Sequence, residues 1–464
     1  MTTTAPDPQP TAPELESGVV TPAVTTPGTA ALLRRLALRV HFFAGILVAP
    51  FLAVLCLTGI IYVFMPQVNN LVYHNEYFVD SHSAPARPLA EQVQAALLAN
   101  PGATLTSVIT PAGEDRTTAV VLSVAGLESE QARTVYLDPY TAQVRGALTT
   151  TNGRPPLQQW LRDLHGNLHL GTPGRLYSEV VASWLPVLII GGLILWIGRR
   201  RKRKARDLLL PERGGKPGRA RTRNRHGALG LWLSIGLLAI SVTGLTWSNY
   251  AGDRFDTLVT AMDAHTPTMP AAAISTPIAG VPPISVDDAL GIARTAGLRG
   301  SLTVTPPSKP TTPFTIKESF QTLPVRSDSV GVDPYTGRVV AELHFTDYPL
   351  AAKLTTLGIL AHSGTLFGPA NQIGMALLAL GTLTMIVLAY RMWWKRRPLR
   401  SGGLPGAPAK PVWSQLSQPV VLVVLLSAAA LSWALPVLGM SLVVFLLADF
   451  GVLGIRRLLR HRIG

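Results

Sequence analysis

Four long apolar stretches constrain this chain more than any other feature of its sequence. They run near residues 40–65, 176–198, 227–250 and 369–390, and each can cross a hydrocarbon core about 30 Å thick. A fifth apolar region, 412–455, has one charged residue, Asp449, and Pro436 near its middle, which favours a hairpin of two helices. Only 14% of the residues are charged, compared with roughly 25% in soluble domains. We therefore expect a polytopic α-helical membrane protein with six transmembrane helices.

The basic residues predict how these helices are oriented. Of the 41 Lys and Arg residues, 26 lie in four short segments beside apolar stretches, at 31–40, 199–225, 391–411 and 456–464. Basic residues flank transmembrane helices on the cytoplasmic side, so both termini are expected in the cytoplasm and both long polar segments outside. The formal net charge is +15, but the basic residues cluster beside apolar stretches. This distribution indicates contact with membrane lipid, and no nucleic-acid partner is expected.

These patterns divide the chain into segments. Residues 1–30, rich in Thr, Pro and Ala, are expected to form a disordered cytoplasmic tail. The other segments are a first transmembrane helix at 31–66, an external domain at 67–175, a second helix at 176–198, a basic cytoplasmic loop at 199–225, a third helix at 226–250, a second external domain at 251–368, a fourth helix at 369–392, a cytoplasmic loop at 393–411, a helical hairpin at 412–455 and a basic cytoplasmic tail at 456–464.

Each external domain has the pattern of a small α+β fold with one helix on an antiparallel sheet. The first predicts a helix at 88–99 and strands near 103–110, 117–125, 131–137 and 143–148. The second predicts a helix at 285–296 and strands near 301–306, 312–319, 328–333 and 338–343.

The sequence also repeats itself. His41 is followed by Thr58-Gly59 at 17 and 18 residues, and His226 by Thr243-Gly244 at the same spacing. Outside the membrane, Asp138-Pro139-Tyr140-Thr141 recurs as Asp333-Pro334-Tyr335-Thr336, and His165 to Gly171 matches His362 to Gly368. Four landmarks in the same order indicate a unit of helix, external domain and helix that is used twice.

The repeat places four histidines at equivalent positions, His41 and His226 at the inner membrane edge and His165 and His362 at the outer edge. A lone histidine at a helix end is usually an interfacial residue, but a pseudo-twofold repeat brings equivalent imidazoles together, as haem iron with two histidine ligands requires. Gly45 and Gly230 lie four residues after the inner histidines, where a missing side chain leaves room for a flat macrocycle. Small-residue helix packing is the alternative explanation of these glycines.

Other chemistry is scarce. His169 lies four residues after His165 and is an alternative outer ligand, a partner of a haem propionate or an exposed polar residue. The single cysteine, Cys56, excludes an internal disulfide, a Cys-ligated iron–sulfur cluster and covalent haem attachment. Zinc is the competing metal, but structural zinc needs four close ligands, whereas these histidine pairs are expected on opposite sides of the membrane.

The repeated motifs resemble those of the PepSY-associated transmembrane family, which includes iron-regulated inner-membrane proteins and ferric-siderophore reductases. The resemblance rests on the start at Arg39-x-His41 with Thr58-Gly59, the doubled Asp-Pro-Tyr-Thr turn and the two His-to-Gly motifs, and it covers about residues 31–397. It implies a multi-pass protein of the bacterial inner membrane with two periplasmic PepSY-like domains. It also implies two b-type haems, with His41, His226, His165 and His362 as axial ligands.

The hypothesis that follows is a transmembrane oxidoreductase that reduces periplasmic ferric iron, held as a ferric siderophore or another ferric chelate. The cytoplasmic loops are too short for a flavin or nicotinamide domain, so the electrons are expected from a quinol or a separate cytoplasmic reductase. The alternative is a non-enzymatic regulator or scaffold that binds a periplasmic peptidase or envelope partner. A permease is disfavoured because the spans lack polar clusters. The catalytic residues, the oligomeric state, the particular chelate and the role of the C-terminal helix pair stay open.

Overall fold

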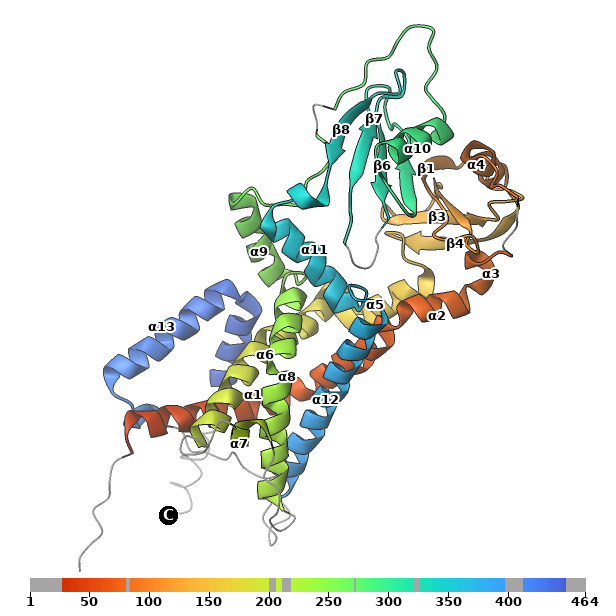
Figure 1. Ribbon diagram of the computed structural model, residues 1–464. Helices are drawn as coiled ribbons and strands as arrows, with labels where there is room; N and C mark the ends of the chain where they lie inside the picture. The colour runs from red at the N-terminus through yellow and green to blue at the C-terminus, as the bar shows by residue number, and fades with distance from the viewer. Residues whose placement is uncertain are drawn as a thin grey trace, which may run out of the picture.

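The computed structural model describes residues 27–80, 84–199, 206–210, 218–270, 273–319, 325–396 and 412–447. The basic tail expected at 456–464 lies outside the described residues, as do most of the tail expected at 1–30 and parts of the loops expected at 199–225 and 393–411. A β-sheet stands at one end of a bundle of long helices (Figure 1). We call this end of the bundle the outer end, and the sheet the external sheet, after the orientation expected from the sequence.

Four of the described helices are long and apolar enough to cross a membrane. They are α1 (Thr29–Val63), α6 (Gly171–Arg199), α8 (Arg219–Leu245) and α12 (Pro369–Trp394). Four of the six expected spans are thereby confirmed. Over the described residues, α13 (Gln418–Ala434) and the following helix at Pro436–Leu447 are each shorter than the about 20 residues of a typical span. Residues 448–455 of the expected hairpin lie outside the described residues.

The four long helices form a ring in which α1 and α8 occupy diagonal corners. Each of these two helices packs against both α6 and α12. Hydrogen bonds cross the ring's edges: Ser241 on α8 donates to the carbonyl of Ala182 on α6 at 2.6 Å, and Tyr390 on α12 donates to that of Ile46 on α1 at 3.2 Å. Because α1 and α8 begin the two repeats, a residue of α1 that faces the centre of the ring has an equivalent on α8 that faces the same space from the opposite corner.

Most of the shorter helices connect the bundle to the external region or cover the sheet, whereas the helix at Arg206–Leu209 and the 3₁₀ turn at Trp413–Gln415 lie at the opposite end of the bundle. Their bounds are α2 (Met65–Val72), α3 (His74–Tyr77), α4 (Leu89–Leu98), α5 (Pro156–Asn167), α7 (Arg206–Leu209), α9 (Tyr250–Ala261), α10 (Val286–Thr295) and α11 (Leu350–Ser363), with 3₁₀ turns η1 (Phe345–Asp347) and η2 (Trp413–Gln415). Helices α5 and α11 matter most for the site, because each lies against the outer end of the bundle and carries an outer histidine near its C-terminal end.

The external region contains one continuous antiparallel sheet of eight strands in the order β4-β3-β2-β1-β5-β6-β7-β8. The first repeat contributes β1 (Thr104–Ile109), β2 (Thr118–Ser123), β3 (Gln131–Leu137) and β4 (Val144–Thr151), and the second contributes β5 (Leu302–Thr305), β6 (Phe314–Glu318), β7 (Ser329–Val332) and β8 (Val339–Leu343). The predicted strand segments therefore form strands. The expectation of two separate small sheets is replaced by a single sheet, because the edge strands β1 and β5 pair with each other.

The two halves of the sheet meet through both polar and apolar contacts. Val108 pairs with Val304 across it, and Thr110 accepts a hydrogen bond from the Leu302 N–H at 2.8 Å. Helices α4 and α10 pack beside each other, and Val286 and Leu290 of α10 contribute to the apolar cores of both halves. A shared core makes the two external halves one structural unit.

The repeated Asp-Pro-Tyr-Thr motif forms the same turn twice. Asp138 accepts the N–H of Tyr140 at 2.8 Å, and Asp333 accepts the N–H of Tyr335 at 2.8 Å. Four residues after each aspartate the backbone is left-handed, with φ +67° at Gly337 and +58° at Ala142. Glycine adopts this conformation freely, whereas alanine is strained in it.

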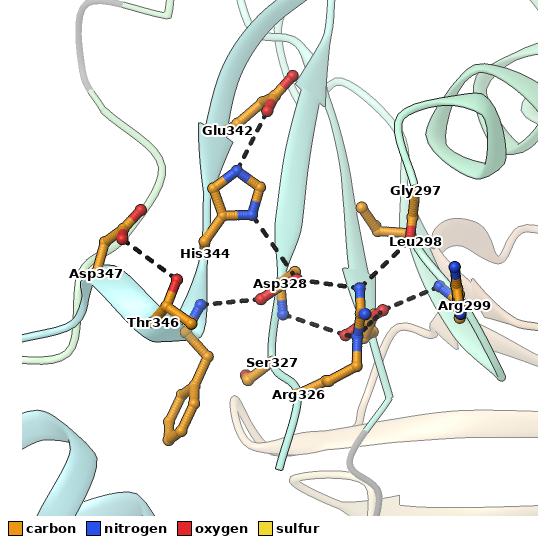
Figure 2. Close-up of polar contacts among 12 residues, drawn as sticks. Gly297, Leu298, Arg299, Arg326, Ser327, Asp328, Glu342, His344, Thr346 and Asp347 are labelled. Carbon is orange, nitrogen blue, oxygen red and sulfur yellow. Dashed lines mark hydrogen bonds and ion pairs between the residues drawn. The ribbon is translucent and has the colours of Figure 1, made fainter. Parts of the chain in front are cut away.

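A charged network joins the strands of the second half of the sheet (Figure 2). Arg326 donates through Nε to both carboxylate oxygens of the buried Glu318 at 3.1 and 3.2 Å, and through Nη2 to Asp328 at 3.1 Å. The ring of His344 lies between Asp328 and Glu342, at 3.7 and 3.3 Å. Since a buried carboxylate is stable only when paired, Arg326 holds the ends of β6 and β7 together.

Candidate functional site

The two inner histidines lie on the diagonal helices α1 and α8, and their rings face each other across the centre of the bundle. The ring centroids of His41 on α1 and His226 on α8 are 6.3 Å apart, with the ring planes at 82°. A metal bonded to one nitrogen of each ring at about 2 Å would separate the centroids by about 6 Å, because each nitrogen lies about 1 Å from its ring centre. The observed spacing therefore fits one metal ion between the two rings.

Each inner histidine is oriented by the second helix of its own repeat. His41 Nδ1 lies 2.9 Å from the carbonyl oxygen of Leu188 on α6, and His226 Nδ1 lies 3.1 Å from that of Met385 on α12. Leu188 and Met385 are themselves equivalent, since each follows the closing glycine of its motif, Gly171 or Gly368, by 17 residues. A carbonyl only accepts hydrogen bonds, so Nδ1 carries the proton in each ring and Nε2 presents a lone pair.

The two inner histidines line a cavity of about 340 Å³ inside the helix bundle. Its walls are mainly apolar side chains of α1, α6, α8 and α12, and Gly45 and Gly230 are among the lining residues. A Cβ atom at Gly230 would lie 3.1 Å from the Met385 methyl group, and one at Gly45 would lie 3.9 Å from Leu188. The structure thus brings both predicted glycines to the same space as the predicted ligands, and the apolar walls fit the faces of a porphyrin.

The outer histidines are each held by the threonine of the repeated Thr-Gly motif. His165 Nδ1 lies 2.8 Å from Thr58 Oγ1, and His362 Nδ1 lies 2.7 Å from Thr243 Oγ1. Thr58 Oγ1 is also 2.8 Å from the Val54 carbonyl oxygen, as Thr243 Oγ1 is 3.0 Å from that of Ala239. The hydroxyl proton goes to that carbonyl, so the threonine oxygen accepts from Nδ1–H and Nε2 again keeps its lone pair.

The glycine after each threonine makes room for the outer ring. A Cβ atom at Gly59 would lie 3.5 Å from His165 Cε1, and one at Gly244 would lie 3.8 Å from His362 Cε1. Burial lowers the pKa of His165 to about 4. Burial, and then the neighbouring His165, lowers the pKa of His362 to about 4. Both rings are therefore neutral at pH 7, the form in which imidazole binds metal.

His169 is not brought to the outer pair in the way that His165 is. It is exposed, its φ is +57°, and its ring lies against that of Trp160 with centroids 4.9 Å apart and the ring planes tilted by 35°. His362 has a ring neighbour of its own in Trp247, at 5.1 Å. Of the two candidates on the first repeat, His165 alone shares the threonine contact of His362.

Sequence reasoning found the threonines as landmarks of the repeat but gave them no role. Their spacing of 17 residues from His41 and His226 is the signal, because it places each threonine almost five turns further along the same helix, at its opposite end. The Leu188 and Met385 carbonyls had no such signal, since any residue type supplies a carbonyl.

The donor set fits haem better than it fits a metal held by the protein alone. Among the described residues, no three His, Cys, Asp or Glu side chains are grouped closely enough to bind a metal ion, which disfavours structural zinc there. Two neutral imidazoles from separate helices, each with Nε2 available, match the axial ligation of a haem whose remaining ligands come from the porphyrin.

Comparison with known families identifies the chain. The PepSY-associated TM region family matches residues 38–396, which include the external sheet, α6, α8, α12 and α1 from residue 38 onward. No protein of curated function matches the sequence. Because the match spans well over half of the chain and confirms the resemblance carried by the repeated motifs, this protein belongs to the PepSY-associated transmembrane family.

Proposed function

We propose that this protein is a dihaem b-type electron conduit of the bacterial inner membrane that reduces a periplasmic ferric chelate, such as a ferric siderophore, and so releases Fe²⁺ for uptake. The observation that carries the proposal is the duplicated histidine orientation: four imidazoles at repeat-equivalent positions, each with Nδ1 bonded to an acceptor. His41 and His226 would hold the inner haem, and His165 and His362 the outer one.

The proposal includes the topology. Both termini and the basic clusters lie in the cytoplasm, the eight-stranded sheet lies in the periplasm, and the C-terminal apolar region adds two spans to the four long helices. An inside-negative potential then favours outward movement of an electron by about 2.3 kcal/mol per 100 mV.

Haem b bound by two histidines supplies a one-electron Fe³⁺/Fe²⁺ couple. The protein's own residues do the rest. The Leu188 and Met385 carbonyls and the Thr58 and Thr243 hydroxyls fix the tautomer and direction of the four rings. The apolar walls of the inner cavity exclude water. One electron from a quinol or a separate cytoplasmic reductase reduces each ferric ion, and oxygen-rich ligands hold Fe²⁺ less tightly than Fe³⁺.

The first test is the absorption spectrum and haem content of the full-length protein, purified in detergent from haem-replete cells. A Soret band, dithionite-sensitive α and β bands and two haems per chain are expected. His226→Ala and His362→Ala should each lose one haem, while His169→Ala, an exposed histidine beside the outer pair, should keep both. A colourless protein, or full haem content in both ligand variants, contradicts the proposal.

Activity is measured in proteoliposomes with a reduced quinol inside and a ferric hydroxamate outside, by trapping Fe²⁺ with a coloured chelator. Wild type should reduce iron, and both ligand variants should not. If the purified protein is colourless, pull-down of a periplasmic partner by the external sheet tests the scaffold alternative instead.

Topology is tested by labelling with a membrane-impermeant maleimide in spheroplasts. After Cys56→Ser removes the native thiol, Ser129→Cys in the turn between β2 and β3 should react from outside, whereas Lys395→Cys beyond the end of α12 should react only after lysis. Both positions are exposed in the structure. The reverse labelling pattern would exclude the proposed orientation.

A further inference from the structure

A half-buried arginine, Arg396, lines the inner cavity just beyond the end of α12. Its Nε and Nη1 atoms are buried and have no hydrogen-bond partner among the described residues. The guanidinium carbon lies 4.8 Å from the centroid of the Phe42 ring, another lining residue. Buried N–H groups are almost always paired in folded proteins, so an orphaned charged donor beside a cavity indicates an anionic acceptor that fills it.

The same end of the cavity collects further positive charge. Arg219 and Arg223 line it from α8, and together with His226 and Gly230 they share one face of that helix at spacings of four, three and four residues. Arg219 precedes His226 by seven residues, about 10 Å along the helix axis. None of the described residues that line the cavity is an aspartate or glutamate. Burial, and then the nearby Arg219, lowers the pKa of Arg396, because both disfavour the charged form of its guanidinium group.

The cavity therefore has two chemically distinct ends. The two imidazoles and the glycines lie in its apolar part, and the arginines lie where α8 begins and α12 ends. A ligand that matches both has a flat apolar body with a metal at its centre and carboxylates along one edge. Haem b has this shape, with two propionates on one edge of the ring.

We propose that Arg396, supported by Arg219, is the carboxylate-binding group of the inner cavity and holds a propionate of the haem whose iron is bound by His41 and His226. This rests on the proposed function and extends it, because it fixes which edge of the porphyrin faces the end of the bundle with the basic clusters. Arg396 acts as a positioning residue: it sets the rotation of the macrocycle about the axis between the two imidazoles.

The test compares haem b with its dimethyl ester, which has the same ring and iron but no carboxylates. The full-length protein with His362→Ala, which removes the outer site, is produced in haem-deficient cells and titrated with each porphyrin by absorption. This background should bind haem b at least tenfold more tightly than the ester. Adding Arg396→Gln should abolish the preference by weakening the binding of haem b alone, and Arg396→Lys should restore part of the preference. Arg391→Gln, at an exposed arginine in the last turn of α12, should leave the preference unchanged.

The outcomes separate the inference from the function on which it rests. If Arg396→Gln keeps the wild-type preference for haem b, the carboxylate assignment is wrong while haem binding stands. If the parent background binds both porphyrins equally, an anionic lipid headgroup or another anion pairs with Arg396, and the assignment is again wrong. If no porphyrin binds to it, both proposals fail.

A second readout does not depend on affinity. In the His362→Ala background, Arg396→Gln removes a positive charge beside the haem. The midpoint potential of the haem should therefore fall, because the ferric form is then favoured over the ferrous form. Arg391→Gln should leave the potential unchanged. An unchanged potential in Arg396→Gln contradicts the assignment.

Discussion

The Nδ1 atom of His165 lies 2.8 Å from the Oγ1 atom of Thr58, and the same contact joins His362 to Thr243 at 2.7 Å. Each threonine passes its own proton to a carbonyl one turn earlier in its helix, so each histidine must be the donor. Two short helices, α5 and α11, are thereby tied to the two diagonal helices of the bundle. The threonines that mark the repeat in the sequence therefore fix the tautomer of the outer histidines.

The first prediction concerns that contact. Thr58→Val keeps the shape of the side chain but removes the acceptor for His165 Nδ1, so the affinity for the outer haem should fall about 10- to 100-fold, the usual effect of losing such a partner. Titration of the apo protein with haem, in a His226→Ala background that isolates the outer site, measures it. Thr58→Ser should restore most of the affinity. Equal affinity in the valine and serine variants would show that the hydroxyl has no role.

The second prediction concerns close packing between α6 and α8. A Cβ atom at Gly227 would lie 2.2 Å from the ring of Trp196, which is buried and donates to the Leu208 carbonyl at 3.0 Å. Gly227→Ala should therefore cost about 1–3 kcal/mol of stability through overpacking. The midpoint of thermal unfolding in detergent reports the loss.

The matched control for that variant is Gly291→Ala. Gly291 also lies inside a helix, α10, but a Cβ there would meet no atom within 4 Å. Alanine should stabilise that position by up to about 1 kcal/mol because it restricts the unfolded chain and favours helix. Equal effects at the two glycines would contradict the packing argument.

The third prediction exploits a difference between the two repeated turns. Ala142 and Gly337 occupy equivalent positions with φ +58° and +67°. Ala142→Gly should stabilise the protein by about 0.5–1 kcal/mol by relieving the left-handed alanine, and Gly337→Ala should destabilise it by a similar amount or more. At Gly337 a Cβ would also lie 3.3 Å from Ile292 Cδ1. Thermal unfolding followed by circular dichroism checks both signs, and changes of the same sign would refute the argument.

The fourth prediction is a pH dependence at Asp333. Burial alone raises its pKa, but hydrogen bonds from the backbone N–H groups of Thr336 and Tyr335 outweigh burial and hold the pKa below 3.8. A carboxyl whose pKa is lower in the folded state stabilises the protein above the unfolded pKa and loses that contribution as the pH falls through the folded value.

Asp333→Asn should therefore cost about 0.5–1.5 kcal/mol at pH 7, and the gap to wild type should narrow below about pH 4. Unfolding midpoints measured between pH 7 and pH 3 check this. Asp347→Asn, at an exposed aspartate on η1, is the control and should change the unfolding midpoint little at pH 7 because few contacts are lost. A gap that stays constant with pH would rule out a lowered pKa at Asp333.

The histidines show most clearly which features of the site the sequence could predict. The spacing of His41 to Thr58 and of His226 to Thr243 is a property of the chain alone, and it indicated both the repeat and the family. The preference for His165 over His169 came from the structure, because α5 ends between them and the backbone turns left-handed at Leu168 and His169. Helical spacing would have placed both on one face, and that assumption fails where the helix stops.

The external sheet shows the same division. Alternating apolar residues predicted strands close to the observed bounds in both halves, because a strand with one buried face has a period of two. The pairing of β1 with β5 was not readable, since an edge strand has the same pattern whether its free edge meets water or a second sheet.

By itself, the sequence determined the four long apolar helices, the duplication, the family and the residue types available for a cofactor. Each of these depends on composition and spacing along the chain. Only the tertiary structure decided which atoms meet. It placed the carbonyls of Leu188 and Met385 on the inner rings and the hydroxyls of Thr58 and Thr243 on the outer rings. It also placed the partly unpaired guanidinium of Arg396 beside the cavity. The physical reason is that hydrogen bonds are directional and short, so they depend on how helices far apart in sequence pack, which no local pattern encodes.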